Sequence, residues 1–231
     1  MNVKFFSFLF ISSLGMLVSC NSEAQESSLS VSEFEEAISQ SNIQILDVRT
    51  TAEFQSGHIG DALLADWNNQ KEFKKLALLL DKSKPVYTYC LSGVRSSAAT
   101  NWLRQNGYTA YNLTGGINAW KLADKPVEQM KMVKQITLEE YMSQIPKDKT
   151  VLADISAVWC PPCKIMKPLI DSMAAANGSR FVLVRIDGGE QTQLCKQLKV
   201  DGFPTFIIYK QGKESWRKQG IVDVKELASK L

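Results

Sequence analysis

Two cysteines separated by two residues form the most informative motif of this 231-residue chain. Cys160 and Cys163 stand at the end of an apolar run and the start of a helix-like segment, within the sequence WCPPCK. A residue before proline avoids helical backbone angles, so we expect Pro161 to be extended and Pro162 to open the helix. Cys160 then lies just outside the helix and Cys163 in its first turn, where their sulfurs can bond without backbone movement. The spacing therefore predicts reversible disulfide chemistry.

The helix start also favours a reactive thiolate at Cys160. Free backbone amides and the helix dipole stabilise an anion there and lower the pKa of the thiol. A C-x2-C pair is also half of a zinc site, but the chain has no second C-x2-C pair and His58 is its only histidine. We therefore expect a redox disulfide between Cys160 and Cys163, with no metal and no cofactor.

A further cysteine lies where a strand-like run passes into a helical pattern. Residues 85–89 predict a buried strand, residues 96–104 predict a helix, and Cys90 begins the sequence CLSGVR between them. Backbone amides and the positive helix end on such a loop form an anion cradle, which lowers the pKa of a thiol. A buried strand-end cysteine is the alternative, but Gly93 and Arg95 both suit close anion approach. We predict that Cys90 is a nucleophile. The loop residues expected to bind its substrate are Leu91, Ser92, Gly93, Val94 and Arg95.

The second half of the chain, from about residue 134 to residue 231, resembles thioredoxin. The matching pieces, in the thioredoxin order and spacing, are VLAD ending at Asp154, WCPPCK at 159–164, Pro168, and GFPT at 202–205. The resemblance implies a thioredoxin fold with a mixed sheet and thiol–disulfide oxidoreductase activity. In this register Leu183 replaces a lysine that often lies near the buried aspartate of thioredoxins.

The thioredoxin resemblance also assigns supporting roles around the cysteine pair. It implies that Pro204 is cis and packs against the disulfide, and that the backbone of Phe203 pairs with a bound thiol partner. It also implies that Asp154 is buried beneath the cysteines and assists proton transfer to Cys163. The supporting residues expected on this basis are Asp154, Trp159, Phe203 and Pro204.

The first half, from about residue 28 to residue 127, resembles a single-domain rhodanese. The matching pieces are ILDVR at 45–49, EF at 53–54, GHI at 57–59, CLSGVR at 90–95, LTGG at 113–116, and Trp120. The resemblance implies a parallel sheet flanked by helices. It also implies that Cys90 attacks a sulfane sulfur, holds it as a persulfide and passes it to a nucleophile. Arg49 and His58 are expected to be structural, and Asp47 to tie down neighbouring loops.

The length of the Cys90 loop bears on the choice of substrate. Four residues separate Cys90 from Arg95, whereas the related dual-specificity phosphatases have five, so the smaller cradle favours sulfur over phosphate. Thiosulfate-using rhodaneses often carry a cation directly after the cysteine, but this chain has Leu91 there. This departure puts thiosulfate in doubt and leaves persulfides or polysulfide open as sulfur donors.

The N-terminal sequence predicts the compartment. A short basic start precedes a mostly apolar run at 5–18, shorter than the roughly 20 residues that span a membrane core. The sequence LVSC at 17–20 resembles a bacterial lipobox, which implies signal cleavage and lipid attachment at Cys20. We therefore expect a lipoprotein signal peptide at 1–19 and a polar tether at 20–29. The protein is then anchored to a bacterial membrane on its extracytoplasmic side, in the periplasm or at the cell surface. An ordinary signal peptide is the alternative.

The remaining residues suffice for two domains of ordinary size. Apolar runs alternate with helical patterns in the first half, which predicts an α/β fold with a parallel sheet. We expect a rhodanese-like domain at 30–127, a linker at 128–133 and a thioredoxin-like domain at 134–231. Capping boxes are expected to open the first helix of each domain, Ser30 with Glu33 and Thr137 with Glu140. Cys195 has no partner motif and is expected to be a small buried hydrophobe.

These features together predict a membrane-anchored thiol–disulfide oxidoreductase coupled to a rhodanese-type sulfurtransferase. The expected partners are thiol or disulfide proteins, sulfane-sulfur donors and a membrane reductant; the net charge of +3 and the lack of a basic cluster argue against nucleic acid. Because both sites are on one chain, we expect Cys160 to attack the outer sulfur of a Cys90 persulfide. Two alternatives remain open. One is a general periplasmic disulfide reductase or isomerase whose rhodanese module recruits substrates, and the other is a non-catalytic binding protein.

Overall fold

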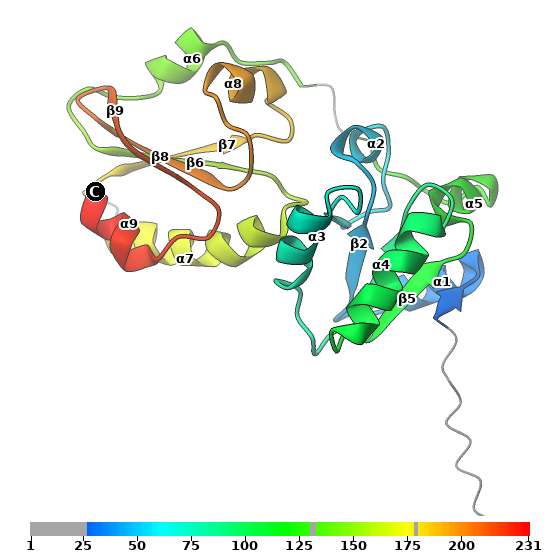
Figure 1. Ribbon diagram of the computed structural model, residues 1–231. Coiled ribbons are helices and arrows are strands. Elements are labelled where there is room, and N and C mark those ends of the chain that lie inside the picture. The colour runs from blue at the N-terminus through cyan, green and yellow to red at the C-terminus, as the bar shows by residue number, and fades with distance from the viewer. Residues whose placement is uncertain (1–26, 130–132, 178–179) are drawn as a thin grey trace, which may run out of the picture.

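The structure is a computed structural model that describes residues 27–129, 133–177 and 180–231 (Figure 1). The predicted signal peptide and the predicted lipid attachment at Cys20 lie outside the described residues. Figure 1 shows two α/β domains side by side, with the start of α7 (Pro161–Asn177) beside α3 (Gln70–Ala77). Within the described residues, no helix is both long and apolar enough to cross a bilayer.

The first domain is a five-stranded sheet with helices on both faces. Its further elements are β1 (Ser28–Leu29), α1 (Val31–Ile38), β2 (Gln44–Asp47), α2 (Thr51–Gln55), β3 (Leu63–Leu64), β4 (Val86–Tyr89), α4 (Val94–Gln105), β5 (Ala110–Leu113) and α5 (Gly116–Leu122). The strand order is β1-β5-β4-β2-β3 and every neighbouring pair is parallel. A parallel sheet must be covered on both faces. Phe73 and Leu103 of α3 and α4 cover one face, and Phe34, Phe54 and Trp120 of α1, α2 and α5 cover the other.

The second domain is a four-stranded mixed sheet. Its further elements are α6 (Leu138–Ser143), β6 (Val151–Ser156), β7 (Val182–Asp187), α8 (Thr192–Gln197), β8 (Thr205–Lys210), β9 (Lys213–Gln219) and α9 (Val224–Lys230). The strand order is β7-β6-β8-β9, with β6 parallel to β7 and antiparallel to β8. Tyr141 of α6 and Leu194 of α8 pack on one face, and Ile170 of α7 and Leu227 of α9 on the other.

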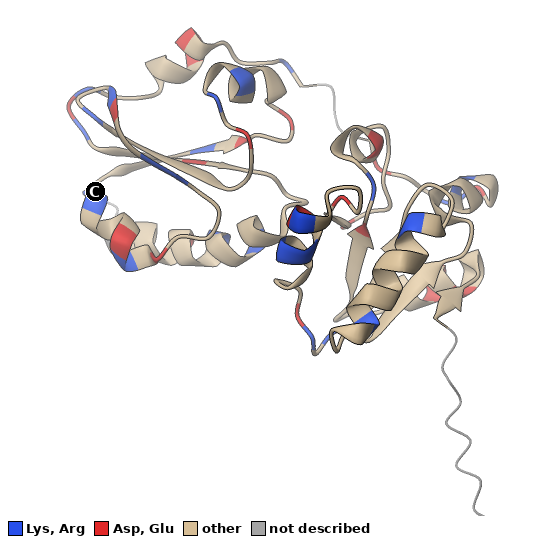
Figure 2. Ribbon diagram, viewed as in Figure 1, with Lys and Arg blue, Asp and Glu red and all other residues tan. Residues whose placement is uncertain are grey.

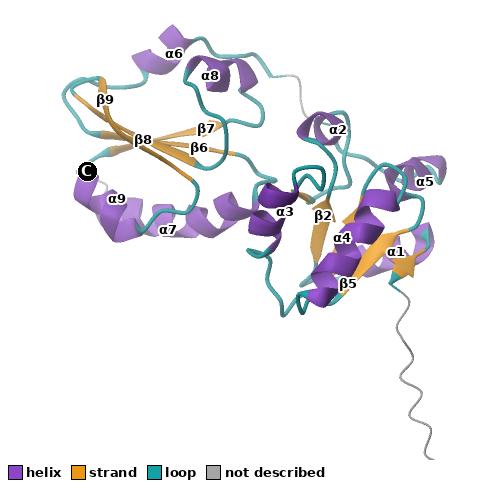
Figure 3. Ribbon diagram, viewed as in Figure 1, coloured by secondary structure: helices purple, strands orange, loops and turns teal. Residues whose placement is uncertain are grey.

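The predicted fold class is confirmed, with a parallel α/β sheet followed by a mixed sheet (Figure 3). The expected capping boxes are present at Ser30 and Thr137. A third capping box, which the sequence analysis missed, opens α2, where Thr50 and Glu53 satisfy each other's backbone amides. Figure 2 shows Lys and Arg interspersed with Asp and Glu over both domains.

Backbone hydrogen bonds join the start of the interdomain linker to the first domain, and another joins the two domains to each other. The amide of His58 donates to the carbonyl of Glu128 at 2.8 Å, and the amide of Glu128 donates back at 2.8 Å. The chain is therefore fastened to the first domain up to residue 128. Between the domains, the amide of Leu64 in β3 donates to the carbonyl of Trp159 at 3.0 Å. The edge strand of the first sheet thus contacts the residue directly before Cys160.

Candidate functional site

The cysteine pair forms a disulfide at the start of α7. The Cα atoms of Cys160 and Cys163 are 5.2 Å apart, and both residues are largely buried, with exposed fractions of 3% and 6%. The amide of Cys163 points at the sulfur of Cys160, at 3.2 Å. A thiolate at Cys160 would therefore receive a hydrogen bond from the first turn of the helix. Within the described residues, no group of three or more metal-binding side chains occurs.

The helix opens one residue earlier than the sequence predicted. The prediction that Pro161 is extended and that Pro162 begins α7 is wrong, because α7 begins at Pro161. The first four amides of a helix have no acceptor within it, so two consecutive prolines are tolerated there despite their missing N–H groups. Cys160 still lies directly outside the helix and Cys163 within its first turn.

Two segments surround the disulfide within the second domain. The peptide bond between Phe203 and Pro204 is cis, as the thioredoxin resemblance implies. The rings of Phe203 and Trp159 meet edge to face at 5.7 Å, and both pack against the small cluster that contains Cys160 and Cys163. Two aromatic rings thus pack against the cysteine pair.

A buried carboxyl group lies on β6, the strand that leads to the disulfide. Asp154 is 4% exposed, and burial raises the pKa of its carboxyl group, while Arg185 partly offsets this effect. The Nε of Arg185 lies 3.4 Å from Asp154 Oδ2, and its other end pairs with Asp171. The sequence analysis found only Leu183 where thioredoxins often have a cation. The structure supplies the cation two residues later, on the strand position that pairs with Asp154.

Cys90 stands at the carboxyl end of β4, enclosed by its own loop. It is 1% exposed, and its sulfur accepts a hydrogen bond from the amide of Gly93 at 3.1 Å. Burial acts to raise the pKa of this thiol. The Ser96 side chain and the amides of Ser96, Ser92 and Gly93 outweigh burial, so the pKa lies below its ordinary value. The loop therefore favours a thiolate, as predicted from its position between strand and helix.

The shape of the Cys90 loop depends on close backbone packing. Gly93 has a φ of 94°, which favours glycine. At Gly116 a Cβ atom would lie 2.5 Å from the carbonyl oxygen of Cys90. Leu91 and Val94 point outward, with exposed fractions of 42% and 75%. The outward side of the loop thus carries two apolar side chains, whereas the inward side presents amides to the sulfur.

Arg95, the last residue of the predicted cradle, is held by Glu53. Its guanidinium donates to the two carboxylate oxygens of Glu53 at 2.9 and 2.6 Å. This pairing, working against a smaller effect of burial, lowers the pKa of Glu53 to about 2. In the sequence, Glu53 is only one of the residues that match the rhodanese pattern, and its contact with Arg95 was not predicted. The capping box of Thr50 and Glu53 is a local signal for the start of α2 and does not indicate Arg95 as a partner.

The sequence predicted structural roles for three polar residues, Asp47, Arg49 and His58, and each of them makes contacts within the first domain. The side chain of Arg49 binds the buried carboxylate of Asp47 at 2.6 Å and donates to the carbonyl of Gly57 at 2.8 Å. Nδ1 of His58 lies 3.2 Å from the carbonyl oxygen of Phe54, and the rings of these two residues stack at 3.9 Å. These contacts position the loop that follows α2.

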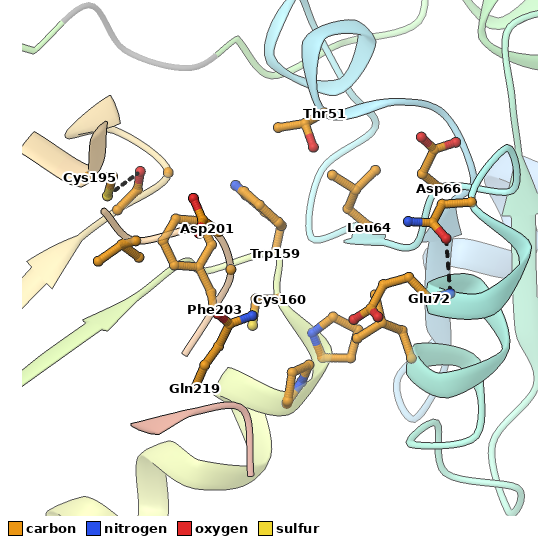
Figure 4. Close-up of a pocket in the computed structure, with 18 of the residues that line it drawn as sticks. Thr51, Leu64, Asp66, Glu72, Trp159, Cys160, Cys195, Asp201, Phe203 and Gln219 are labelled. Carbon is orange, nitrogen blue, oxygen red and sulfur yellow. Dashed lines mark hydrogen bonds between the residues drawn. The ribbon is translucent and has the colours of Figure 1, made fainter. Parts of the chain in front are cut away.

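Cys160 of the disulfide lines a cleft between the two domains, which has a volume of about 610 Å³ (Figure 4). The wall from the first domain consists of Thr51, Gln55, Leu64, Asp66, Asn69, Glu72, Lys75 and Leu76. The wall from the second domain includes Trp159, Cys160, Pro161, Lys196, Asp201 and Phe203. Cys90 is not among the residues that line this cleft. The sequence did not predict the cleft, because its walls come from two separately folded surfaces.

One short helix contacts the surroundings of both sites. Glu53 of α2 binds Arg95 in the Cys90 loop. The ring of Phe54 lies 5.8 Å from that of Trp159, and the Nε2 of Gln55 donates to the carbonyl of Gly189 at 3.4 Å. Consecutive residues of α2 thus join the Cys90 loop to the second domain.

The remaining described cysteine is a poor nucleophile. Cys195 has no disulfide partner, is buried and lines the cleft. Burial, with a contribution from Asp187, raises the pKa of its thiol to about 11. This environment fits the expected small hydrophobe.

Comparison with known proteins gives a match for each half of the chain. The family models that match are the rhodanese-like domain, over residues 30–123, and thioredoxin, over residues 132–231. Thioredoxin from Echinococcus granulosus is 34% identical over 83 residues, which cover 36% of this chain and 77% of that protein. Thioredoxin X of Arabidopsis thaliana chloroplasts is 29% identical over 114 residues, or 48% of this chain and 63% of that protein. Thioredoxin Y of Oryza sativa chloroplasts is 32% identical over 84 residues, or 36% and 50%. The chain thus spans about half to two thirds of these chloroplastic relatives.

Solved structures also resemble the two halves. A rhodanese-related protein from Thermoplasma volcanium is 28% identical, with a TM-score of 0.40 over 45% of this chain and 98% of that one. A thioredoxin from Nicotiana alata is 30% identical, with a TM-score of 0.37 over 45% of this chain and 94% of that one.

Proposed function

The chain belongs to the thioredoxin family over residues 132–231 and carries a rhodanese-like domain over residues 30–123. We therefore propose that it is a thiol–disulfide oxidoreductase coupled to a sulfurtransferase. We further propose that it is anchored to a membrane on the extracytoplasmic side. One observation carries the redox part of this proposal. The Cys160–Cys163 disulfide stands at a helix start and opens into a cleft. The rhodanese-like domain supports a sulfurtransferase role through Cys90.

The redox reaction uses the two cysteines in sequence. The Cys160 thiolate, which lines the cleft, attacks one sulfur of a substrate disulfide and releases the other as a thiolate. Cys163 then loses its proton and attacks the Cys160 sulfur, which closes the protein disulfide and releases the second substrate thiol. Two electrons pass from the cysteine pair to the substrate. A dithiol reductant, which we assign to a membrane partner, restores the pair by the reverse exchange.

The sulfurtransferase reaction uses the Cys90 thiolate. It attacks the terminal sulfur of a persulfide or polysulfide, forms a Cys90 persulfide and releases the shortened donor. Stabilisation of the persulfide anion is supported by the amide of Gly93, which donates to the Cys90 sulfur, and by the positive charge of Arg95, which interacts with Cys90. The buried position of Cys90 protects the persulfide from bulk solvent.

We propose that the two reactions are coupled through the Cys90 persulfide. Cys160 takes the outer sulfur, Cys90 leaves as a thiolate, and Cys163 then closes the disulfide and releases hydrosulfide. Because Cys90 does not line the cleft at Cys160, this transfer requires either that the domains separate or that a second molecule presents its cysteine pair. Tethering gives effective concentrations in the ~mM range when the geometry allows contact.

A single-turnover experiment tests the coupling. The full chain is reduced, freed of reductant and mixed with one equivalent of polysulfide that carries labelled sulfane sulfur; sulfide release is then followed at several protein concentrations. Cys90→Ser measures direct reaction of polysulfide with the cysteine pair. Release that requires both Cys90 and Cys160 supports coupling, and its concentration dependence distinguishes transfer within one chain from transfer between chains. A labelled persulfide that persists on Cys90 beside a reduced pair would overturn it.

The anchoring part of the proposal rests on the LVSC sequence that ends at Cys20. A diacylglyceryl group on Cys20 would hold the protein at the membrane, within reach of a membrane reductant. In cells, the wild type should partition into the detergent phase and Cys20→Ala into the aqueous phase. A wild type that is cleaved at another residue and stays aqueous would contradict the lipobox.

A second candidate function has one observation in its favour. The rhodanese-like domain provides a wall of the cleft at Cys160, so it is placed to select disulfide substrates without transferring sulfur itself. In this case Cys90→Ser would leave disulfide reduction unchanged, and the chain would form no labelled persulfide.

A further inference from the structure

The first domain covers much of the surface around Cys160. The amide of Leu64 binds the carbonyl of Trp159, and Phe54 packs against the Trp159 ring. Gln55 binds the backbone of the second domain at Gly189. In Figure 4, Trp159 and Cys160 lie between Phe203 on one side and Leu64 and Glu72 on the other. A substrate must therefore enter the space between the domains to meet the reactive sulfur.

The remaining space suits a small molecule. The cleft has a volume of about 610 Å³, within the ~300–1,000 Å³ typical of small-molecule sites. A folded protein partner, by contrast, covers roughly 800 Å² of each surface in a stable interface. Because α3 and β3 form part of the cleft wall, we expect them to keep the disulfide of such a partner away from Cys160.

Charged side chains of both signs line the cleft. Asp66, Glu72 and Lys75 come from the first domain, and Lys196 and Asp201 from the second. Lys75 and Glu72 lie 3.7 Å apart. Lys196 and Asp201 have no ion-pair partner among the described residues. A ligand that carries both ammonium and carboxylate groups at each end matches this arrangement.

We propose that the cleft is a binding site for small zwitterionic disulfides, namely the disulfides of amino acids or short peptides. This inference rests on the proposed disulfide reduction at Cys160. Cys160 attacks one sulfur of the bound disulfide and releases the first small thiolate. Cys163 then attacks Cys160, releases the second small thiol and closes the protein disulfide. The electrons come from the reduced cysteine pair, which a dithiol reductant regenerates.

Rates of a single oxidation event test the substrate class. The full chain is reduced, freed of reductant and mixed with excess cystine, glutathione disulfide or insulin. Samples are quenched with acid and alkylated, and mass spectrometry gives the fraction of oxidised Cys160–Cys163 pairs. We expect second-order rate constants for cystine and glutathione disulfide at least about tenfold above that for insulin.

Two neighbouring lysines on α3 provide a matched pair of variants. Lys75 lines the cleft and Lys74 does not, although both are exposed. Lys75→Glu should lower the rate constants for cystine and glutathione disulfide about fivefold, since it replaces attraction to a substrate carboxylate by repulsion. Lys74→Glu makes the same change in net charge and should have no effect. Lys196→Glu, on the opposite wall, should resemble Lys75→Glu.

The possible results separate this inference from the proposed function. If insulin reacts as fast as the small disulfides, or if Lys75→Glu and Lys74→Glu behave alike, the cleft is not the binding site. If none of these disulfides oxidises the reduced Cys160–Cys163 pair of the wild type, the proposed reductase function itself is wrong. Thermal unfolding of each variant establishes that the substitution has not changed the fold.

Discussion

Cys90 and Cys160 occupy equivalent places in two different sheets, yet their surroundings differ. Each follows the carboxyl end of a buried strand and precedes a helix, so each sulfur meets free amides from the helix start. Cys90 receives its hydrogen bond from Gly93, and Cys160 faces the amide of Cys163. The same local geometry therefore favours a thiolate in both domains.

The difference lies in what surrounds each loop. Cys90 is enclosed by residues of its own domain, whereas Cys160 opens into a cleft with one wall from each domain. In the function proposed above, the closed loop protects a covalent sulfur intermediate from solvent. The cleft admits and selects an external disulfide. The comparison teaches that local backbone geometry makes a cysteine reactive, while the packing beyond the loop decides what it reacts with.

The largest effect is expected from substitution of the redox cysteines, and the two substitutions should give different results. Cys160→Ser should lower disulfide reduction more than about 10³-fold, because it removes the attacking thiolate. In Cys163→Ser, Cys160 should still attack the substrate disulfide. The resulting mixed disulfide cannot be resolved, so it should accumulate on Cys160. Non-reducing gels and mass spectrometry measure the trapped species. Equal trapping by both variants would contradict this order of attack.

The reactivity of Cys90 should depend on Ser96. The Ser96 side chain lowers the pKa of the Cys90 thiol. Ser96→Ala should move the midpoint of Cys90 alkylation to higher pH and slow alkylation at pH 7 about three- to tenfold, as the loss of one hydrogen bond implies. Site-resolved mass spectrometry of the alkylated chain measures this effect.

Ser97 supplies the control, because it is the next serine of α4 and does not contribute to the pKa of Cys90. Ser97→Ala should leave the midpoint unchanged. Within the same samples Cys195, whose thiol has a pKa raised to about 11, should react only at much higher pH. A midpoint that does not move in Ser96→Ala would mean that the backbone amides alone set the reactivity of Cys90.

The sequence predicted the fold class and the position of each reactive cysteine because both depend on local signals. Apolar runs, caps and the C-x2-C spacing act within a few residues of each other. The wrong helix start at Pro161 shows the limit of a single local rule. A residue before proline usually avoids the helical conformation, but Pro161 adopts it. The first turn of a helix tolerates prolines, because the amides there need no acceptor within the helix.

The contacts that tune the sites could not be predicted, because they join residues far apart in the chain. Arg95 meets Glu53 across 42 positions, and Arg185 meets Asp154 only through the register of β6 and β7. The cleft requires the relative placement of two folded domains. No pattern within either domain indicates that Leu64 will bind the carbonyl of Trp159.

The buried carboxyl group of Asp154 on β6 should affect the free energy of unfolding with a definite sign. Burial raises the pKa of Asp154 above its ordinary value of 3.8, so ionisation costs the folded state stability as the pH rises through the raised pKa. Asp154→Asn should therefore be more stable than the wild type at pH 7 in the oxidised form, and the gain should vanish near pH 3. Urea unfolding across this range measures it.

Asp171 provides a control of opposite sign for Asp154. Lys167 and Arg185 lower the pKa of Asp171, which is exposed, so Asp171→Asn should destabilise the protein at pH 7. If Asp154 also assists proton transfer to Cys163, Asp154→Asn should slow resolution of the mixed disulfide while Asp171→Asn does not. A destabilised Asp154→Asn variant at pH 7 would mean that its pairing with Arg185 outweighs its burial.

The smallest expected effect concerns Glu53, the residue of α2 that binds the Cys90 loop. Its pKa is lowered from 4.5 to about 2, so it contributes stability that is complete above pH 4.5 and is lost as the pH falls toward 2. Because its side chain is 28% exposed, solvent screening reduces this contribution, and Glu53→Gln should cost only about 1 kcal/mol at pH 7. Glu33→Gln is the matched control, since Glu33 belongs to the same kind of capping box, with Ser30. Unfolding of both variants at pH 7 and pH 3 isolates the Arg95 contact.

The same Glu53→Gln variant also tests the role of α2, because Phe54 and Gln55 of this helix contact the second domain at Trp159 and Gly189. If Glu53→Gln slows persulfide formation on Cys90 and also changes the rate at which Cys160 attacks a disulfide, then α2 couples the two sites. If only the Cys90 reaction changes, the two loops act independently and share only the chain that joins them.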